Sequence, residues 1–337
     1  MGYPPPSGGW QPGQVPLLEL RPGIIPLRPL GLGDVYAAAM KTIRGNVAAT
    51  IGLAFVTTLI LTVPSTALGA WLNSLAVDPT DPYASTTSAL GPVGSAIPSV
   101  VIAFGSIILT GFMAYVVGQG VLGRRVGAGE TWAGSRGRLL RVIGAAILTG
   151  LAELLVVAAF VAIPVVLLVT ADSNSSTATA VLLIVAAVLA ALVVLVVLWT
   201  RFAFPTAAIV LEKVGVFSGI ARSWRLTSGG QFWRILGIRL LTAIIVGVAG
   251  EILTVPISMI AYATTFFTGN ESSLLVVQAV IAGVTGLLTG AITTPFTAAV
   301  DAILYIDQRI RREGLDVRLI AAAQSAAQPP WDAAARR

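Results

Sequence analysis

Two acidic residues, Glu153 and Glu251, interrupt long apolar stretches and are the side chains best placed to do chemistry. A carboxylate inside a membrane is costly, about 2.5–3.5 kcal/mol on insertion scales for a central Asp, and such residues often belong to an ion or proton pathway. A protonated or hydrogen-bonded glutamate can also hold two helices together without any role in transport. Both interpretations remain open, and we expect the two side chains to face the interior of a helix bundle as a candidate intramembrane polar site.

Most other catalytic chemistry is excluded because two residue types are absent. The chain has no cysteine, which removes thiolate nucleophiles and thiolate metal ligands, and no histidine, which removes the commonest metal ligand and general base. Glycine is abundant, but the phosphate-binding pattern GxxxxGK[ST] does not occur. We therefore expect no catalytic residue, no metal site and no cofactor, and we do not expect an enzyme.

The composition predicts an all-α integral membrane protein. Apolar residues make up 56% of the 337-residue chain and charged residues only 11%, whereas ordinary globular domains carry about 25% charged residues. A helix needs about 20 mainly apolar residues to cross the hydrocarbon core. The sequence predicts six such helices: Val47–Leu72, Ile97–Leu122, Val142–Leu168, Ala180–Phe204, Leu240–Phe267 and Leu274–Val300.

The basic residues divide cleanly between the connections of these spans. All 21 Lys and Arg residues lie in the N-terminal part, in segments 123–141 and 200–239, or in the C-terminal part, and none lies in loops 77–96, 170–179 and 268–273. Basic residues stay on the cytoplasmic side of a membrane. The distribution predicts a multi-pass plasma-membrane protein with both termini in the cytoplasm, and it explains the net charge of +6 without a nucleic-acid partner.

A weak internal repeat predicts three hairpins as pseudo-repeats of one unit. The motifs Ile51-Gly52-Leu53, Ile143-Gly144-Ala145 and Leu236-Gly237-Ile238 open spans one, three and five. Each motif follows a basic, partly amphipathic stretch, which we expect to form an interfacial helix. These stretches are 34–44, 130–141 and 216–228.

Three regions follow from this organisation. Residues 1–30 are rich in Pro and Gly, and we expect them to form a disordered cytoplasmic tail. We expect residues 31–313 to form the six-span membrane domain and residues 314–337 to form a loosely ordered cytoplasmic tail. After span six, Asp301–Gln324 predicts a charged helix. Its pairs Asp307–Arg311 and Arg309–Glu313 have i,i+4 spacing, and we expect them to favour solubility more than architecture.

Segment Val216–Thr227 predicts an amphipathic helix in the plane of the membrane. Phe217, Ile220, Ala221 and Trp224 share one helical stripe. Such a helix can bind anionic lipid headgroups or a partner, or it can serve as a plain topological anchor. The candidate residues for a lipid-headgroup or interfacial site are Arg222, Trp224, Arg225, Trp233 and Arg234.

The stretch Arg222–Gly237, RSWRLTSGGQFWRILG, resembles the RSW-x-L…G-x-FW-x-x-LG signature of bacterial proteins of the glycerophosphoryl diester phosphodiesterase membrane-domain family. The segment IIPLRPLGLGD at residues 24–34 is similar to the start of its actinobacterial members, uncharacterised six-span membrane proteins. The resemblance implies a membrane module that serves a lipid-headgroup enzyme. No phosphodiesterase barrel follows span six and the chain has no histidine, so the resemblance favours the fold and argues against phosphodiesterase activity.

Two functional hypotheses follow. The first is a non-enzymatic scaffold or lipid- and partner-interacting module of the plasma membrane, whose partners are the bilayer, anionic headgroups or another membrane protein. The alternative is a small-solute or proton-coupled transporter or channel that uses Glu153 and Glu251.

Overall fold

The computed structural model describes residues 23–26, 28–76, 90–169, 174–267 and 271–319. Across these ranges the chain forms helices and no strand, and six of the helices are long and apolar enough to cross a membrane. This confirms the predicted all-α, six-span membrane fold. The long helices are α2 (Leu53–Ala76), α3 (Leu90–Val121), α5 (Leu139–Val169), α6 (Asn174–Arg201), α9 (Phe232–Phe267) and α10 (Glu271–Glu313).

Short helices connect the spans. A π-helical turn, Ala48–Gly52, leads into α2, and 3-10 turns at Arg136–Arg138 and Gly229–Gln231 precede α5 and α9. Pro205 begins α7, where a proline fits because the first helical N–H has no partner within the helix. The short α-helices are α1 (Leu32–Gly45), α4 (Ala128–Ser135), α7 (Pro205–Glu212) and α8 (Val216–Thr227).

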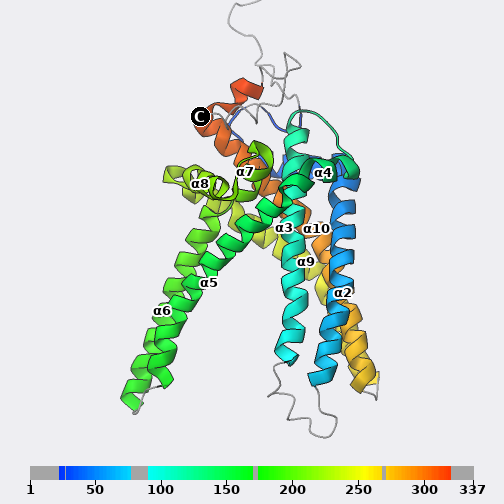
Figure 1. Ribbon diagram of the computed structural model, residues 1–337, viewed down its shortest axis with the longest axis vertical. Helices are drawn as coiled ribbons and strands as arrows, with labels where there is room; N and C mark the ends of the chain where they lie inside the picture. Colours follow the sequence, from blue (N-terminus) through cyan, green and yellow to red (C-terminus); the bar gives the residue numbers. More distant parts are fainter. Residues whose placement is uncertain (1–22, 27, 77–89, 170–173, 268–270, 320–337) are drawn as a thin grey trace, which may run out of the picture.

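The spans are arranged in two arms that diverge with distance from α7 and α8 (Figure 1). One arm is the pair α5 and α6, which pack against each other. The other arm contains α2, α3 and α10, with α9 packed on α10. Helices α4, α7 and α8 lie across one end of the molecule, where the two arms meet.

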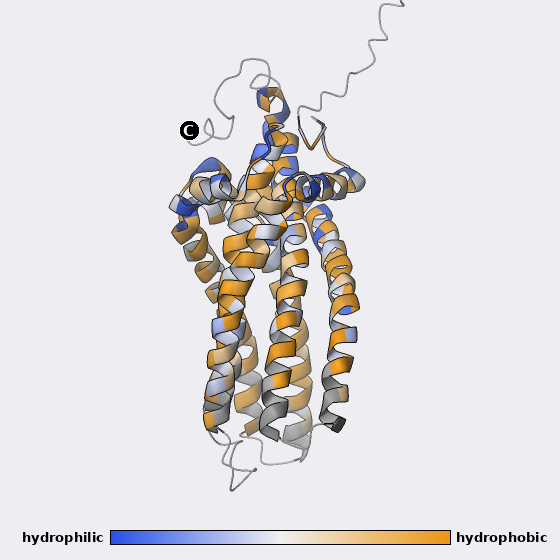
Figure 2. Ribbon diagram, turned by 90° about the vertical axis from the view of Figure 1, so that its right-hand side faces the viewer, coloured by the Kyte–Doolittle hydropathy of each residue, from blue (hydrophilic) through white to orange (hydrophobic). Residues whose placement is uncertain are grey.

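Polar and charged residues concentrate at this end, which we call the basic end, while the spans are apolar along their length (Figure 2). The largest buried core also lies here, because it combines side chains of α1 and α7 with those of the second half of α10, among them Val35, Phe204 and Tyr305. The α-helical segments that position the candidate site are therefore held by packing at the end of the bundle.

Two sequence-based boundaries need correction. We expected span six to end at Val300 and a charged helix to follow over Asp301–Gln324, but α10 runs without a break from Glu271 to Glu313, and Gly314 then interrupts the expected charged helix with a positive φ of 61°. We also expected residues up to 30 to be disordered, yet Ile25 and Leu30 are buried in the core. Apolar side chains in this proline-rich segment pack on the bundle, which composition alone does not reveal. The remainder of both predicted tails, 1–22 and 320–337, lies outside the described residues.

Candidate functional site

Helix α8 is fixed to the turn between α6 and α7 by one serine and one glycine. The Ser223 hydroxyl donates to the Arg201 carbonyl at 2.6 Å and accepts from the Phe204 backbone N–H at 3.0 Å. Gly219 faces α7 so closely that a Cβ there would lie 2.7 Å from Cγ1 of Ile209. These contacts hold α8 across the ends of the spans.

Arg222, a candidate headgroup ligand, instead points inward to two carboxylates. Its Nε and Nη2 donate to Oε1 of Glu212 at 3.1 and 2.9 Å, and its Nη2 donates to Oε2 of Glu313 at 2.7 Å. Burial disfavours the charged form of this guanidinium, but the hydrogen bonds to Glu212 and Glu313 outweigh burial and raise the pKa of Arg222 above its ordinary value. Arg222 is therefore a permanent cation joining α8 to α7 and α10.

Two side chains of α10 complete this arrangement. The Tyr305 hydroxyl donates to Oε1 of Glu212. The fully buried Arg309 forms ion pairs through its Nε with Glu212 at 3.3 Å and Glu313 at 3.1 Å. We call these five side chains, Glu212, Arg222, Tyr305, Arg309 and Glu313, the buried charge cluster. With two arginines and two carboxylates it is neutral overall, and both carboxylates are engaged in ion pairs rather than available as a catalytic acid and base.

A second group of charges surrounds Asp307 on α10. Its carboxylate accepts from Arg234 Nη1 at 2.5 Å, from Arg311 Nε at 3.0 Å and from the Leu30 backbone N–H at 2.8 Å. Both arginines also donate to the Leu30 carbonyl, at 2.7 and 2.8 Å. Arg234 is thus a link between α9, α10 and the segment before α1, not a ligand facing the lipid headgroups.

The pairs Asp307–Arg311 and Arg309–Glu313 form with the expected i,i+4 spacing. Their expected role in solubility is wrong, because Asp307 and Arg309 are both 0% exposed. The helix that carries them is covered by α1, α7 and α8, which the local sequence does not indicate.

The other three candidate headgroup residues do lie on the surface. Trp224 is 44% exposed and Trp233 is 75% exposed, and Arg225 is exposed between them in the sequence. Phe217, on the first turn of α8, is 77% exposed. The Arg201 guanidinium lies 5.1 Å from the Trp224 ring, within the range of a cation–π interaction. We call Phe217, Trp224 and Arg225, together with Trp233 at the start of α9, the aromatic face of α8.

The two intramembrane glutamates do not form a joint site. Glu153 on α5 is half-buried. Glu251 on α9 is exposed, so the expectation that it faces the bundle interior is wrong. No hydrogen bond or ion pair joins the two side chains among the residues that the structure describes. Apolar residues lie on every side of α9, and its sequence therefore gives no indication of which face turns inward.

An intramembrane ion pair that the sequence analysis did not propose lies near Glu153. Arg239 forms an ion pair with Asp301 through Nε at 3.2 Å and donates to the Trp199 carbonyl. Its guanidinium also lies 4.0 Å from the centre of the Trp199 ring. Arg239 thereby connects α6, α9 and α10. Its contacts lie where the two arms meet.

The acidic partners Glu212, Asp301 and Asp307 were all missed as site residues. Glu212 and Asp301 are single acids in apolar stretches close to basic residues, which is a signal that could have identified them, whereas Asp307 lies in the charged run DQRIRRE. In the described part of the chain, no three acidic side chains gather as a metal site would require.

Comparison with known proteins gives one match. The family model described as Domain of unknown function (DUF7847) matches residues 72–305, from the end of α2 to the buried charge cluster. No curated protein and no solved structure matches the chain.

Proposed function

This chain belongs to the DUF7847 family, and we propose that it is a non-enzymatic module of the plasma membrane that binds anionic lipid headgroups at the aromatic face of α8. The proposal includes a scaffolding role toward a membrane partner. The resemblance of residues 222–237 to the membrane domains of glycerophosphoryl diester phosphodiesterases is consistent with this role, since such a module would present headgroups to a separate enzyme.

The proposed orientation places the basic end and both termini in the cytoplasm. The sequence contains four basic segments, and the described part of each lies at the basic end. The positive-inside rule requires such segments to share one side of the membrane. In the same proposal, the six spans are three hairpins, α2–α3, α5–α6 and α9–α10, preceded by the interfacial helices α1, α4 and α8. The close packing within each of these pairs supports the repeat.

The single observation that carries the headgroup proposal is the exposure of aromatic and basic side chains on a helix that crosses the ends of the spans. Tryptophan favours the headgroup level because its ring is amphipathic. A basic residue near an anionic leaflet contributes about 1 kcal/mol of attraction. Phe217, Trp224 and Trp233 would enter the boundary of the acyl region, and Arg225 would lie at the phosphate level.

Lipid retention by the purified full-length protein tests this proposal. The protein would be exchanged into micelles containing equal phosphatidylglycerol and phosphatidylcholine, and the bound lipids counted by native mass spectrometry. We expect a preference for phosphatidylglycerol that falls about fivefold in Arg225→Gln, which corresponds to the loss of one surface attraction. Arg318→Gln is the matched control, because Arg318 is also exposed but lies beyond the end of α10. Equal retention by wild type and Arg225→Gln would contradict the proposal.

The alternative function is that of a transporter or channel. The position of Glu153 inside a span is the observation that favours it. This glutamate is half-buried within a span. A proton-coupled protein in proteoliposomes should give a pH-driven flux that Glu153→Gln and Glu251→Gln abolish, because an amide cannot titrate. The proposed module should give no flux in any of the three forms.

A further inference from the structure

Arg201, the last residue of α6, is held against two aromatic rings. Its guanidinium carbon lies 5.1 Å from the centre of the Trp224 ring on α8 and 5.4 Å from the centre of the Phe232 ring at the start of α9. Its backbone carbonyl accepts from the Ser223 hydroxyl, which places the residue at the level of α8. Aromatic faces attract a guanidinium, whose flat shape stacks on them. The rings therefore fix this cation at the basic end.

The charge of Arg201 has no acidic partner. Among the described residues its side chain forms no ion pair and donates no hydrogen bond, although the residue is part-buried. Every other buried or part-buried arginine in the described chain donates to a carboxylate or a carbonyl oxygen. These are Arg138, Arg222, Arg234, Arg239, Arg309 and Arg311.

One of the three guanidinium nitrogens of Arg201 can reach a group outside the protein. Nε and Nη1 are covered by protein and have no hydrogen-bond partner. Nη2 also has no partner in the described chain, but it is accessible. Hydrogen bonds between ionised groups are about twice as strong as those between neutral groups. A negatively charged oxygen at Nη2 would therefore meet both an open donor and an uncompensated positive charge.

Two further cations lie beside this position. Arg225 follows Trp224 on α8, and Arg312 of α10 donates to the Arg225 and Ser228 carbonyls at the end of the same helix. Both are exposed, and neither forms an ion pair within the described chain. Aromatic faces can also bind the quaternary ammonium of choline. The Arg201 guanidinium disfavours an ammonium here, because it already lies against both rings and carries the same charge.

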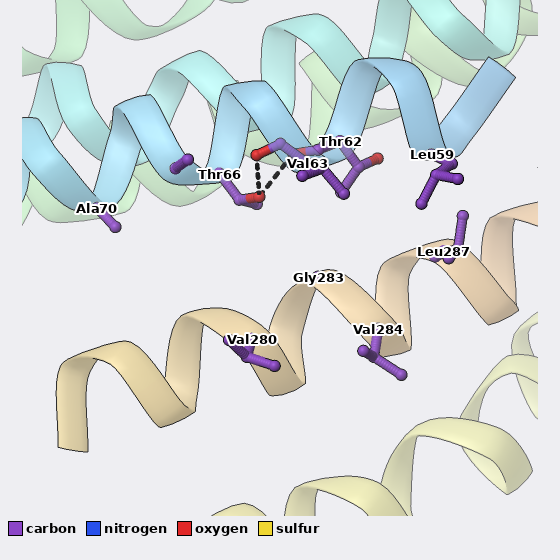
Figure 3. Close-up of a pocket in the computed structure, with 10 residues that line it drawn as sticks. Leu59, Thr62, Val63, Thr66, Ala70, Val280, Gly283, Val284 and Leu287 are labelled. Carbon is purple, nitrogen blue, oxygen red and sulfur yellow. Dashed lines mark hydrogen bonds between the residues drawn. The ribbon is translucent and has the colours of Figure 1, made fainter. Parts of the chain in front are cut away.

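The groove of about 390 Å³ between α2 and α10 differs from this position in chemistry (Figure 3). Its walls are mainly apolar, and the hydroxyl of Thr66 donates to the Thr62 carbonyl within α2. None of the described residues that line the groove is charged. The groove therefore cannot distinguish an anionic headgroup from a zwitterionic one, and the ratio of two bound lipids reports on the charged end of the molecule.

We propose that Arg201, held by Trp224 and Phe232, binds the phosphate of an anionic phospholipid whose headgroup lacks an ammonium, and that Nη2 donates to a phosphate oxygen. This inference rests on the proposed binding of headgroups at the aromatic face of α8. It adds the residue that contacts the phosphate and the class of headgroup that the site selects. Arg225, fully on the surface, then contributes attraction without a fixed position.

The ratio of phosphatidylglycerol to phosphatidylcholine retained by the full-length protein tests this proposal. Both lipids are supplied equally in micelles, and native mass spectrometry counts them. Arg201→Met keeps an apolar stem against the rings but removes the charge, and we expect the ratio to fall about tenfold because a hydrogen bond to a charged group is lost. Arg138→Met is the matched control. It removes the same charge from the basic end, but the Arg138 guanidinium already donates to the Gly134 carbonyl at 2.8 Å, so the ratio should change less than twofold.

The outcomes separate this inference from the proposed function. A ratio that depends on Arg225 but is unchanged in Arg201→Met would leave the proposed function standing and overturn the inference, as would equal losses in Arg201→Met and Arg138→Met. A wild-type ratio of one would overturn both. Arg201→Met removes no hydrogen bond within the described chain, so we expect its Tm to match that of wild type; Arg201→Gln gives the same comparison if the methionine variant does not fold.

A soluble phosphate ester distinguishes the two sources of the phosphate. Glycerol 3-phosphate, added at the same concentration as the lipid, should not displace phosphatidylglycerol, because it lacks the acyl chains that enter the membrane beside Phe217 and Trp233. Displacement by glycerol 3-phosphate would show that the site binds a free phosphate ester, and it would overturn the assignment to a lipid.

Discussion

The two arms of the protein bury their apolar surface very differently. In α3 and α10, 44% of the most apolar stretch of each span is buried inside the protein, and in α2 and α9 the shares are 17% and 11%, whereas in α5 and α6 the share is 6%. Lipid tails are as apolar as leucine, so there is no hydrophobic drive to bury these helices against one another. The α5–α6 arm therefore leaves most of its apolar surface uncovered by protein, while packing around α3 and α10 and the buried charges hold the rest of the molecule.

The buried charge cluster should be the most sensitive part of the molecule. Arg309→Ala leaves Glu212 and Glu313 with Arg222 as their remaining cation in the cluster, so we expect a loss of about 3–5 kcal/mol in the free energy of unfolding. Denaturant unfolding of the purified protein in mild detergent measures this loss. Arg318→Ala, at an exposed site, is the control. A loss below 1 kcal/mol for Arg309→Ala would show that the cluster does not support the fold.

The attachment of α8 to α7 should show an intermediate effect. In Gly219→Ala the new Cβ would lie 2.7 Å from Ile209 Cγ1 and 3.3 Å from the Pro205 carbonyl oxygen. Overpacking of this kind costs about 1–3 kcal/mol, and the same unfolding measurement reports it. Gly237→Ala is the control, because a Cβ there meets no atom within 4 Å. If the clash is the cause, Gly219→Ala should cost less in an Ile209→Ala background, which lacks Cγ1, and a double-mutant cycle measures this difference.

The α5–α6 arm should show the smallest effect. Leu182 is 68% exposed on α6, so Leu182→Ala should change the free energy of unfolding by no more than about 0.5 kcal/mol. Leu304→Ala on α10 is the buried counterpart, at 0% exposure, and should cost about 2–5 kcal/mol. A large loss in Leu182→Ala would mean that a protein surface, such as a second copy of the chain, covers this arm.

The sequence was sufficient to predict the six spans and the bounds of α8, because apolar length and short-range periodicity determine them. It did not reveal the contact of Arg222 with Glu313 or that of Leu30 with Asp307, because these partners lie 91 and 277 residues apart in the chain. Helical periodicity reports only which residues share a face, and not what covers that face. Because periodicity does not show what covers a face, the sequence predicted both Arg222 and Arg225 at the headgroup level. Only Arg225 lies on the surface.

The position of the acidic partners on α10 has a consequence for how the chain enters the membrane. Arg222, Arg234 and Arg239 are synthesised before α10, which supplies Glu313, Asp307 and Asp301 to them. Arg239 and Asp301 are 62 residues apart, which is about 3–12 s of translation. During that interval these arginines lack the acids of α10 and can act as topological signals. In the proposed orientation, the arginines that act as topological signals before α10 is made then form the ion pairs that join α8 and α9 to α10.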